Sequence, residues 1–430
     1  MGINKFSHEE KRILFITAFF PPDNVSGAIR TGHWAKALMQ LGFKTDILTA
    51  RTAKLYPQTS NIDVSNFRNR IFEVDFKLSN FSAHKNTTQS SKGHKLTNTA
   101  LLLKNLKTHF GLIDLFYFWI FPAYMFFKEY LMQEKYDYII SSHLPTASSI
   151  IAFLIKRSSK DSIWIADLRD LWSDNPNIGK LIKIYERLLE KLVLSKADIL
   201  VTVSEPLCNV LRKRYPSKTI LQIENGFDEK EFPGWKKNLL SSNFSINKEK
   251  FNFSYTGLLS KDRDPKIFFQ AVNRLFSTKE NKSKLEVNFY GNNSSLAKES
   301  VKNVNADLAK SVYCHDVVDR LSSLRIQREA DFLLLFESSK VENIGNLTGK
   351  IFEYMASGTP IIAIGVCKNH VVSKVLEKTG TGIGVNTLEE LEEILSDILF
   401  SNKFKYYDPK ISEIEYYTRS NQINRLLKSL

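Results

Sequence analysis

The segment with the most specific chemistry is NLTGKIFEYMASGTPIIA, at residues 346–363. Thr348 and Gly349 begin a predicted helix, so their backbone N–H groups are free to meet an anion. Lys350 lies in the first turn, and Glu353 lies one turn later on the same face. A cation suits a phosphate and a carboxylate suits ribose hydroxyl groups, so this spacing is typical of a nucleotide-binding helix. The alternative is an ion pair between Lys350 and Glu353 on a surface helix.

A second cationic segment, TGLLSKDRDPK, occupies residues 256–266 directly after a strand-like run. Its glycine is followed by three cations, Lys261, Arg263 and Lys266. Such a cluster suits a diphosphate that gains negative charge as it leaves a sugar. The alternative is a solvated basic loop.

The first half of the chain has a glycine turn and a histidine at predicted strand ends. Gly27, in FFPPDNVSGAIR, permits a close backbone approach, and the helix that begins there could present N–H groups to a phosphate or sugar oxygen. The alternative is a plain strand-to-helix turn. His143, in SSHLP, is a candidate general acid or base, or a hydrogen-bond donor to the substrate. The alternative is a histidine that only packs.

Charged residues follow another predicted strand, in DLRDLWSD at residues 167–174. Ligands of open α/β sheets bind at the carboxyl ends of the strands. Arg169 and Asp170, together with Arg30, are therefore candidates for the acceptor side of a site. The alternative is that Arg169 pairs with Asp167 or Asp170, because buried charges need partners.

Strand-like and helix-like patterns alternate along the chain, which predicts parallel sheets. The first series comprises residues 12–17, 28–41, 44–49, 136–141, 148–156, 163–166 and 199–203, and the second comprises residues 251–256, 265–276, 287–290, 332–336, 349–356 and 361–364. The two series predict two Rossmann-like domains, at residues 1–225 and 226–405. We expect residues 406–430 to form a helix that returns to the first domain.

Composition narrows the class of protein. The chain has 430 residues, a length that suits two α/β domains. Its three cysteines, Cys208, Cys314 and Cys367, are far apart and form no metal-binding motif, which indicates a reducing, cytoplasmic compartment. The net charge of +14 favours nucleic acid, anionic lipid or phosphorylated small molecules, but no nucleic-acid-binding motif accompanies it.

A basic segment precedes an aromatic run. The run covers residues 112–127 and includes Phe116, Tyr117, Trp119 and Phe121, and the cations before it are Lys85, Lys92, Lys95, Lys104 and Lys107. Together they could dock on an anionic membrane surface, which would place the protein peripherally on the inner face of the cytoplasmic membrane. The alternative is that the aromatic residues belong to the core of the first domain.

These motifs, in this order, resemble the retaining GT-B glycosyltransferases, the family of bacterial mannosyltransferases and of enzymes that assemble polysaccharide, O-antigen and capsule. The resemblance is strongest in FFPPDNVSGAIR, DLRDLW, VTVSEPL, IENGFD and GKIFEYMASGTPII. It implies a GT-B architecture, in which two Rossmann-like domains face each other across a cleft. It also implies a hexosyltransferase that uses a UDP or GDP sugar, with no tightly bound cofactor or metal, to extend a lipid-linked glycan such as lipopolysaccharide.

The resemblance also implies roles for single residues. Gly27 matches the loop that approaches the donor's phosphate and sugar, and His143 matches the histidine that contacts the transferred sugar. Lys261 or Arg263 matches the cation for the diphosphate. Glu353 matches the carboxylate that holds the ribose and is, with His143, a candidate catalytic residue. Thr348, Gly349 and Lys350 lie in the donor-phosphate segment.

One position departs from the family pattern. A second glutamate often lies eight residues before the first, but Gly345 stands there, and the nearest acid is Glu342. The departure weakens the assignment of a catalytic carboxylate more than it weakens the resemblance to the family. Two other functions therefore stay open: a sugar-nucleotide epimerase of the same fold, and a non-catalytic partner of another transferase.

Overall fold

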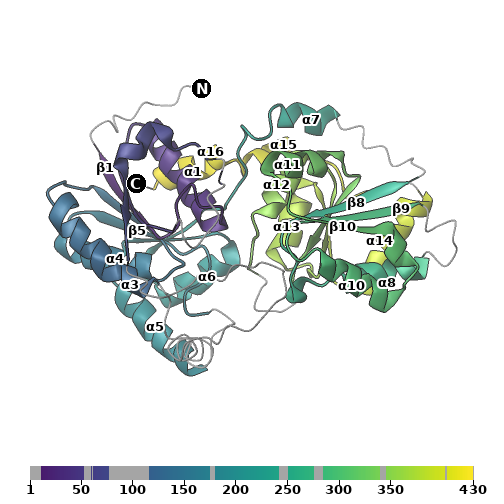
Figure 1. The fold of residues 1–430 in the computed structure, drawn as a ribbon, viewed down its shortest axis with the longest axis horizontal. Coiled ribbons are helices and arrows are strands. Elements are labelled where there is room, and N and C mark those ends of the chain that lie inside the picture. Colours follow the sequence, from purple (N-terminus) through teal and green to yellow (C-terminus); the bar gives the residue numbers. More distant parts are fainter. Residues whose placement is uncertain are drawn as a thin grey trace, which may run out of the picture. The chain divides into compact units, whose positions relative to one another are not determined.

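The computed structural model describes residues 11–52, 60, 62–76, 116–174, 180–241, 250–275, 284–338, 345–401 and 404–429. The contacts between residues divide the chain into two compact units (Figure 1). The first unit comprises Met1–Val203 and Leu207–Ile223. The second comprises Ser204–Pro206 and Glu224–Leu430.

The first unit is built on a seven-stranded parallel sheet with the strand order β3-β2-β1-β4-β5-β6-β7. Its strands are β1 (Arg12–Thr17), β2 (Lys44–Ala50), β3 (Ile71–Val74), β4 (Tyr138–Ser142), β5 (Ile163–Asp167), β6 (Ile199–Thr202) and β7 (Thr219–Gln222). Its helices are α1 (Ser26–Gln40), α3 (Tyr117–Phe126), α4 (Ala147–Ser158), α5 (Lys180–Leu194) and α6 (Glu205–Arg214), with short turns η1 (Ser65–Arg70) and η2 (Phe127–Leu131). The central strands are apolar and buried nearly throughout, as expected for a parallel sheet covered on both faces.

The second unit repeats this plan with a six-stranded parallel sheet in the order β10-β9-β8-β11-β12-β13. Its strands are β8 (Phe251–Thr256), β9 (Leu285–Tyr290), β10 (Val312–His315), β11 (Phe332–Phe336), β12 (Ile361–Ile364) and β13 (Gly382–Val385). Its helices are α7 (Trp235–Ser241), α8 (Lys266–Leu275), α10 (Ser295–Val304), α11 (Arg320–Glu329), α12 (Lys350–Ser357), α13 (Val371–Thr379), α14 (Leu388–Ser401), α15 (Ile411–Glu415) and α16 (Arg419–Leu427), with turns η3 (Lys261–Arg263) and η4 (Leu308–Ser311). Helix α8 packs against α10 and α14 (Figure 1). The two sheets confirm the predicted pair of Rossmann-like folds.

Each unit has its own hydrophobic core. The core of the second unit is rich in phenylalanine: Phe251, Phe253, Phe268, Phe269, Phe289, Phe332 and Phe336 are all buried. Neighbouring rings stack across the strands, with centroid distances of 5.1 Å for Phe253–Phe332 and 6.0 Å for Phe289–Phe336. Such pairs stabilise a core by about 0.5–1.5 kcal/mol beyond the area they bury. Helices α15 and α16 belong to this unit, and α15 packs against α13. Packing of residues 406–430 on the first domain stays a prediction.

The aromatic run of the first unit divides between core and surface. Phe116 and Trp119 are buried in the core around α3, as the packing alternative predicted. Phe121, on the same helix, is 72% exposed. The basic residues Lys85, Lys92, Lys95, Lys104 and Lys107 lie outside the described residues. Among the residues that the structure describes, no helix is both long enough and apolar enough to cross a bilayer.

Candidate functional site

Lys350 is the centre of a cluster at the carboxyl end of the second sheet. Its Nζ donates a hydrogen bond of 2.7 Å to the Tyr255 hydroxyl and lies 4.5 Å from the centre of that ring. Gly257, just after β8, has a φ of +130°, and a Cβ at this position would overlap the Lys350 side chain. Only glycine therefore meets both demands, the backbone angle and the space for the lysine. At Gly349, which precedes α12, an added Cβ would meet no atom within 4 Å, so the helix N-terminus opens onto free space.

Arg263 and Glu337 complete the cluster. The Arg263 guanidinium forms an ion pair of 3.0 Å with Glu337, whose side chain is only 4% exposed at the end of β11. Burial, and after it the positive charge of Arg263, together lower the pKa of Lys350 to about 8. Burial raises the pKa of Glu337, whereas Arg263, Thr348 and Lys350 oppose that rise. Lys261 is exposed on the same short turn, so the structure brings Arg263 rather than Lys261 to Lys350.

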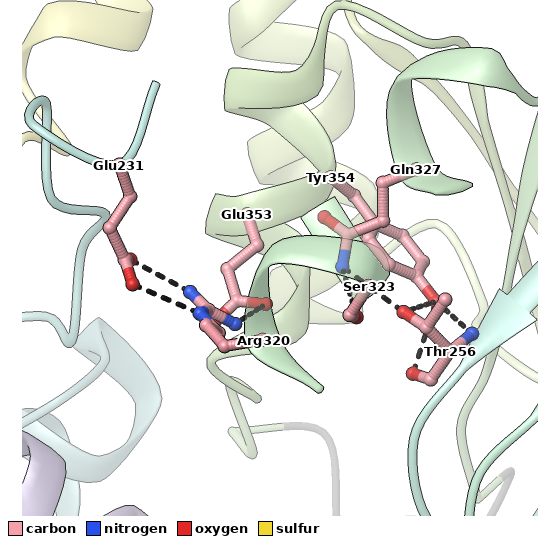
Figure 2. A network of polar contacts seen from close by, with 7 residues as sticks. All are labelled: Glu231, Thr256, Arg320, Ser323, Gln327, Glu353 and Tyr354. Atoms are coloured by element: carbon pink, nitrogen blue, oxygen red, sulfur yellow. Dashed lines mark hydrogen bonds and ion pairs between the residues drawn. The ribbon is translucent and has the colours of Figure 1, made fainter. Parts of the chain in front are cut away.

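Glu353 is held by Arg320 and not by Lys350. Arg320 Nη1 lies 2.8 Å from Glu353 Oε2, while its Nε and Nη2 donate hydrogen bonds of 3.0 and 2.8 Å to the Glu231 carboxylate (Figure 2). Asp319 caps the helix that begins at Arg320 by accepting a hydrogen bond from the Ser322 N–H. Arg320 thereby links two carboxylates, and the surface pair expected as the alternative for Lys350 and Glu353 does not form among the described residues.

A second set of hydrogen bonds fixes the two helices that carry Arg320 and Glu353. The Tyr354 hydroxyl accepts from the Thr256 N–H at 2.9 Å, and Gln327 Nε2 donates to Thr256 Oγ1 at 3.1 Å (Figure 2). Tyr354 is fully buried, which raises the pKa of its phenol to about 12. Helices α11 and α12 are thus both tied to the end of β8, and a fixed carboxylate at Glu353 is the result.

In the first unit, Gly27 and Arg169 face each other. A Cβ added to Gly27 would lie 3.5 Å from Arg169 Nη1 and 3.7 Å from Nη2. The two residues border a cavity of about 320 Å³ whose apolar walls are Phe19, Val25, Phe116, Leu144 and Pro145. Arg169 forms no ion pair with Asp167 or Asp170 within the described part of the chain, so the alternative expectation for it is wrong. Asp170 is exposed.

Arg30 lies inside the protein rather than in this cavity. Its guanidinium donates two hydrogen bonds to Asp167, at 2.9 and 2.8 Å, and one of 3.0 Å to the Ile223 carbonyl. It also lies 4.3 Å from the centre of the Trp34 ring. Both charged side chains are almost completely buried. These contacts give Arg30 a structural role, and its contact with an acceptor stays a prediction.

His143 is buried and only 1% exposed. Its ring packs against Trp172 with a centroid distance of 4.7 Å and an interplanar angle of 34°, and Nδ1 lies 3.3 Å from Ser149 Oγ. Burial, aided by the positive charge of Arg169, lowers the pKa of His143 to about 3. The ring is therefore neutral near pH 7, which favours hydrogen bonding through its unpartnered Nε2 over proton transfer.

The structure thus gathers most of the predicted residues into two clusters, one in each unit. Sequence reasoning missed four residues of the second cluster: Tyr255, Glu337, Arg320 and Glu231. Glu337 directly follows the apolar run 332–336, so the strand-end rule could have found it. Arg320 and Glu231 are 89 residues apart, and no pattern joins them. No group of three or more His, Cys, Asp or Glu side chains suits a metal ion among the described residues.

Several solved structures share this fold over nearly the whole chain. The sucrose-phosphate synthase of Thermosynechococcus elongatus matches with a TM-score of 0.65 at 13% identity, covering 98% of this chain and 99% of that one. HepE of Anabaena, in complex with UDP-glucose, matches with a TM-score of 0.59 at 12% identity, covering 97% and 100%. The chain has the GT-B fold.

The UDP-GlcNAc 2-epimerase of Methanocaldococcus jannaschii also matches, with a TM-score of 0.55 at 14% identity and coverage of 97% and 100%. A sucrose-phosphate synthase and a sugar-nucleotide epimerase thus share this fold. No protein-family model and no curated protein sequence matches the chain. What this GT-B chain does is consequently argued from its side chains.

Proposed function

We propose that the chain is a retaining glycosyltransferase that moves a sugar from a UDP or GDP donor to a lipid-linked glycan during surface polysaccharide synthesis. The observation that carries this proposal is the cluster of Lys350 and Arg263 at the open N-terminus of α12, with Glu353 one turn further along. Two cations and a helix N-terminus suit a diphosphate. HepE, which shares the fold, is known with UDP-glucose bound.

The residues of the second unit would act on the donor in distinct ways. Lys350 and Arg263 would stabilise the negative charge that develops on the diphosphate as the bond to the sugar breaks. Because these two side chains supply the positive charge, the proposal requires no tightly bound metal. Glu353, fixed by Arg320, would accept hydrogen bonds from the ribose hydroxyl groups.

A donor screen tests this function and separates it from the alternatives. A ligand that binds only the native state at 100 times its Kd stabilises the protein by about 2.7 kcal/mol, so UDP and GDP sugars can be ranked by the rise in Tm. We expect one of them to bind and to be consumed only when a glycan acceptor is added. Turnover without an acceptor would favour the epimerase, and no binding of any nucleotide sugar would favour the non-catalytic partner.

Replacing Glu353 by Gln is expected to raise KM for the donor about 10- to 50-fold with little change in kcat, because the variant loses a hydrogen bond to a charged group. Arg320 keeps its contacts with Glu231, so the fold is retained. The variant should also lose the preference for ribose over 2′-deoxyribose donors, as measured by initial rates. Glu329→Gln, which removes a carboxylate from an exposed ion pair on the same unit, is the matched control. An unchanged sugar preference in Glu353→Gln would rule out the ribose contact.

We propose that helix α5, which the sequence analysis did not single out, is the surface that contacts the membrane. It belongs to a row of helices, α3, α4 and α5, that lie side by side in the first unit (Figure 1). Its apolar residues 184, 188 and 192 are 59–66% exposed and lie four apart, so they form one stripe. Lys183, Arg187 and Lys191 form a parallel basic row beside it. An apolar stripe next to a basic row suits the surface of an anionic bilayer.

We expect Leu188→Asp to reduce sedimentation with vesicles of phosphatidylglycerol and phosphatidylcholine at least fivefold. The replacement puts a negative charge into the apolar stripe of α5, and Leu188 is 66% exposed, so folding should be unaffected. Leu321→Asp, at a 76% exposed leucine of α11, is the control and should sediment like the wild type. Raising the salt concentration should weaken wild-type binding, since the basic row contributes. Equal sedimentation of the wild type and Leu188→Asp would exclude α5 as the docking surface.

A further inference from the structure

Arg169 is a cation without an anion. Its guanidinium forms no hydrogen bond or ion pair within the described part of the chain, and its Nε is buried without a partner. The carboxylates nearest to it in the sequence do not pair with it: Asp167 is bound by Arg30, and Asp170 forms no ion pair with it within the described residues. A buried donor left unpaired costs about 1–3 kcal/mol, so an unfilled arginine at a cavity wall points to a ligand.

The N-terminus of α1 adds positive potential at the same place. Arg169 lies over Gly27, in the first turn of this 15-residue helix. That turn contains no acidic residue, and Val25 at the N-cap position supplies no side-chain hydrogen bond. The helix dipole therefore points its positive end at a guanidinium, an arrangement that is unfavourable until an anion lies between them.

The other walls of the cavity indicate what kind of molecule carries the anionic group. Apart from Ser26, Gly27 and Arg169, its walls are apolar and include the aromatic rings of Phe19 and Phe116 and the ring of Pro145. Such surfaces pack against the C–H face of a sugar ring and offer nothing to a second charge. The cavity volume of about 320 Å³ lies at the lower end of the range for small-molecule sites, about 300–1,000 Å³, which suits one substituted monosaccharide.

We propose that this cavity binds an acceptor sugar that carries a negatively charged substituent, a phosphoryl or carboxylate group, which Arg169 and the first N–H groups of α1 hold together. The inference rests on the proposed function, because it assigns the cavity to the acceptor. It makes Arg169 the residue that selects charged over neutral acceptor sugars. Gly27 is required because any side chain there would occupy the space of the anion.

Calorimetric titration of the full chain with glucose 6-phosphate, glucuronate and glucose tests the inference. We expect the two anionic sugars to bind and glucose to bind at least tenfold more weakly. Arg169→Gln should lose that discrimination, and so should Gly27→Ala, whose methyl group meets Arg169 and Phe19 at ordinary contact distance and favours the helix. Arg157→Gln, which removes an exposed cation from α4, should bind like the wild type.

Titration of the same variants with UDP and GDP distinguishes a failure of this inference from a failure of the proposed function. Donor binding that survives in Arg169→Gln while the anionic sugar is lost supports the acceptor assignment. Equal loss of both would mean that Arg169 binds the donor diphosphate, which overturns the inference. It is also overturned if the wild type binds neither anionic sugar while a nucleotide still binds. No nucleotide binding at all would instead refute the proposed function.

Discussion

Replacing Lys350 by Met is expected to reduce transfer about 10²- to 10³-fold and, at the same time, to stabilise the second unit. The loss of activity follows because the cation nearest the helix N-terminus no longer meets the developing charge. The gain in stability follows because burial disfavours the charged lysine, whose pKa falls from 10.5 to about 8 on folding. That fall corresponds to about 3 kcal/mol at most. The Tyr255 hydroxyl keeps a partner, since it donates to the Leu258 carbonyl at 2.7 Å.

The stability difference should depend on pH in a defined window. Between pH 8 and 10.5 the unfolded chain keeps a proton on Lys350 that the folded chain has released. The free energy of unfolding of the wild type therefore rises with pH across that window, relative to Lys350→Met. The advantage of the variant should be complete below pH 8 and absent above pH 10.5. Donor affinity of the wild type should fall as pH rises above about 8, because the diphosphate binds the protonated form.

Thermal melts from pH 7 to 10.5, alongside transfer assays, measure both effects. Lys302→Met, on the exposed face of α10, removes an unburied lysine and should change neither. We expect Lys350→Met to melt several degrees higher than the wild type at pH 7. A variant that melts lower and still transfers sugar would contradict the assignment of Lys350 to the donor site.

Replacing Arg30 by Met is expected to lower the free energy of unfolding of the first unit by about 3–5 kcal/mol. The change leaves the Asp167 carboxylate buried, 1% exposed, without its guanidinium partner. The double variant Arg30→Met with Asp167→Leu should recover most of the loss, because removing both charges of a buried pair is nearly neutral. Urea denaturation measures these differences.

Arg169→Met is the matched control for Arg30. It removes the same kind of side chain two residues beyond the end of β5, at a partly exposed residue that has no ion-pair partner among the described residues. We expect a change within about 1 kcal/mol. A loss of less than 1 kcal/mol in Arg30→Met would show that the buried pair does not hold the sheet to α1.

The fold could be predicted because buried parallel strands have a recognisable sequence pattern. The strands β1, β4, β8, β11 and β12 are short apolar runs, buried along nearly their whole length, and the predicted ranges overlap each of them. Several candidate residues were found by one rule, that ligands bind where such strands end. That rule gave Gly27, His143, Arg169 and the segment with Arg263, whereas Lys350 and Glu353 were found from the start of their helix and their spacing on it.

Which charged side chains pair with each other could not be predicted, because the pairs join distant parts of the chain. Asp167 is bound by Arg30, 137 residues away, and not by its neighbour Arg169. Lys261 and Arg263 are two residues apart on one short turn, and only the fold decides which of them meets Glu337. The stripe on α5 was missed for another reason, since its helix has no motif and only its exposure distinguishes it.

The contact between Trp172 and His143 has a spectroscopic consequence. Four of the five tryptophans, at positions 34, 119, 164 and 172, belong to the first unit, and Trp235 alone belongs to the second. Trp172 lies against the histidine beside Arg169, whereas the core of the second unit is built from phenylalanine, which emits weakly. Intrinsic fluorescence is therefore mainly a signal from one half of the molecule. Quenching by an acceptor analogue should be visible directly, while a nucleotide on Lys350 should leave the emission almost unchanged.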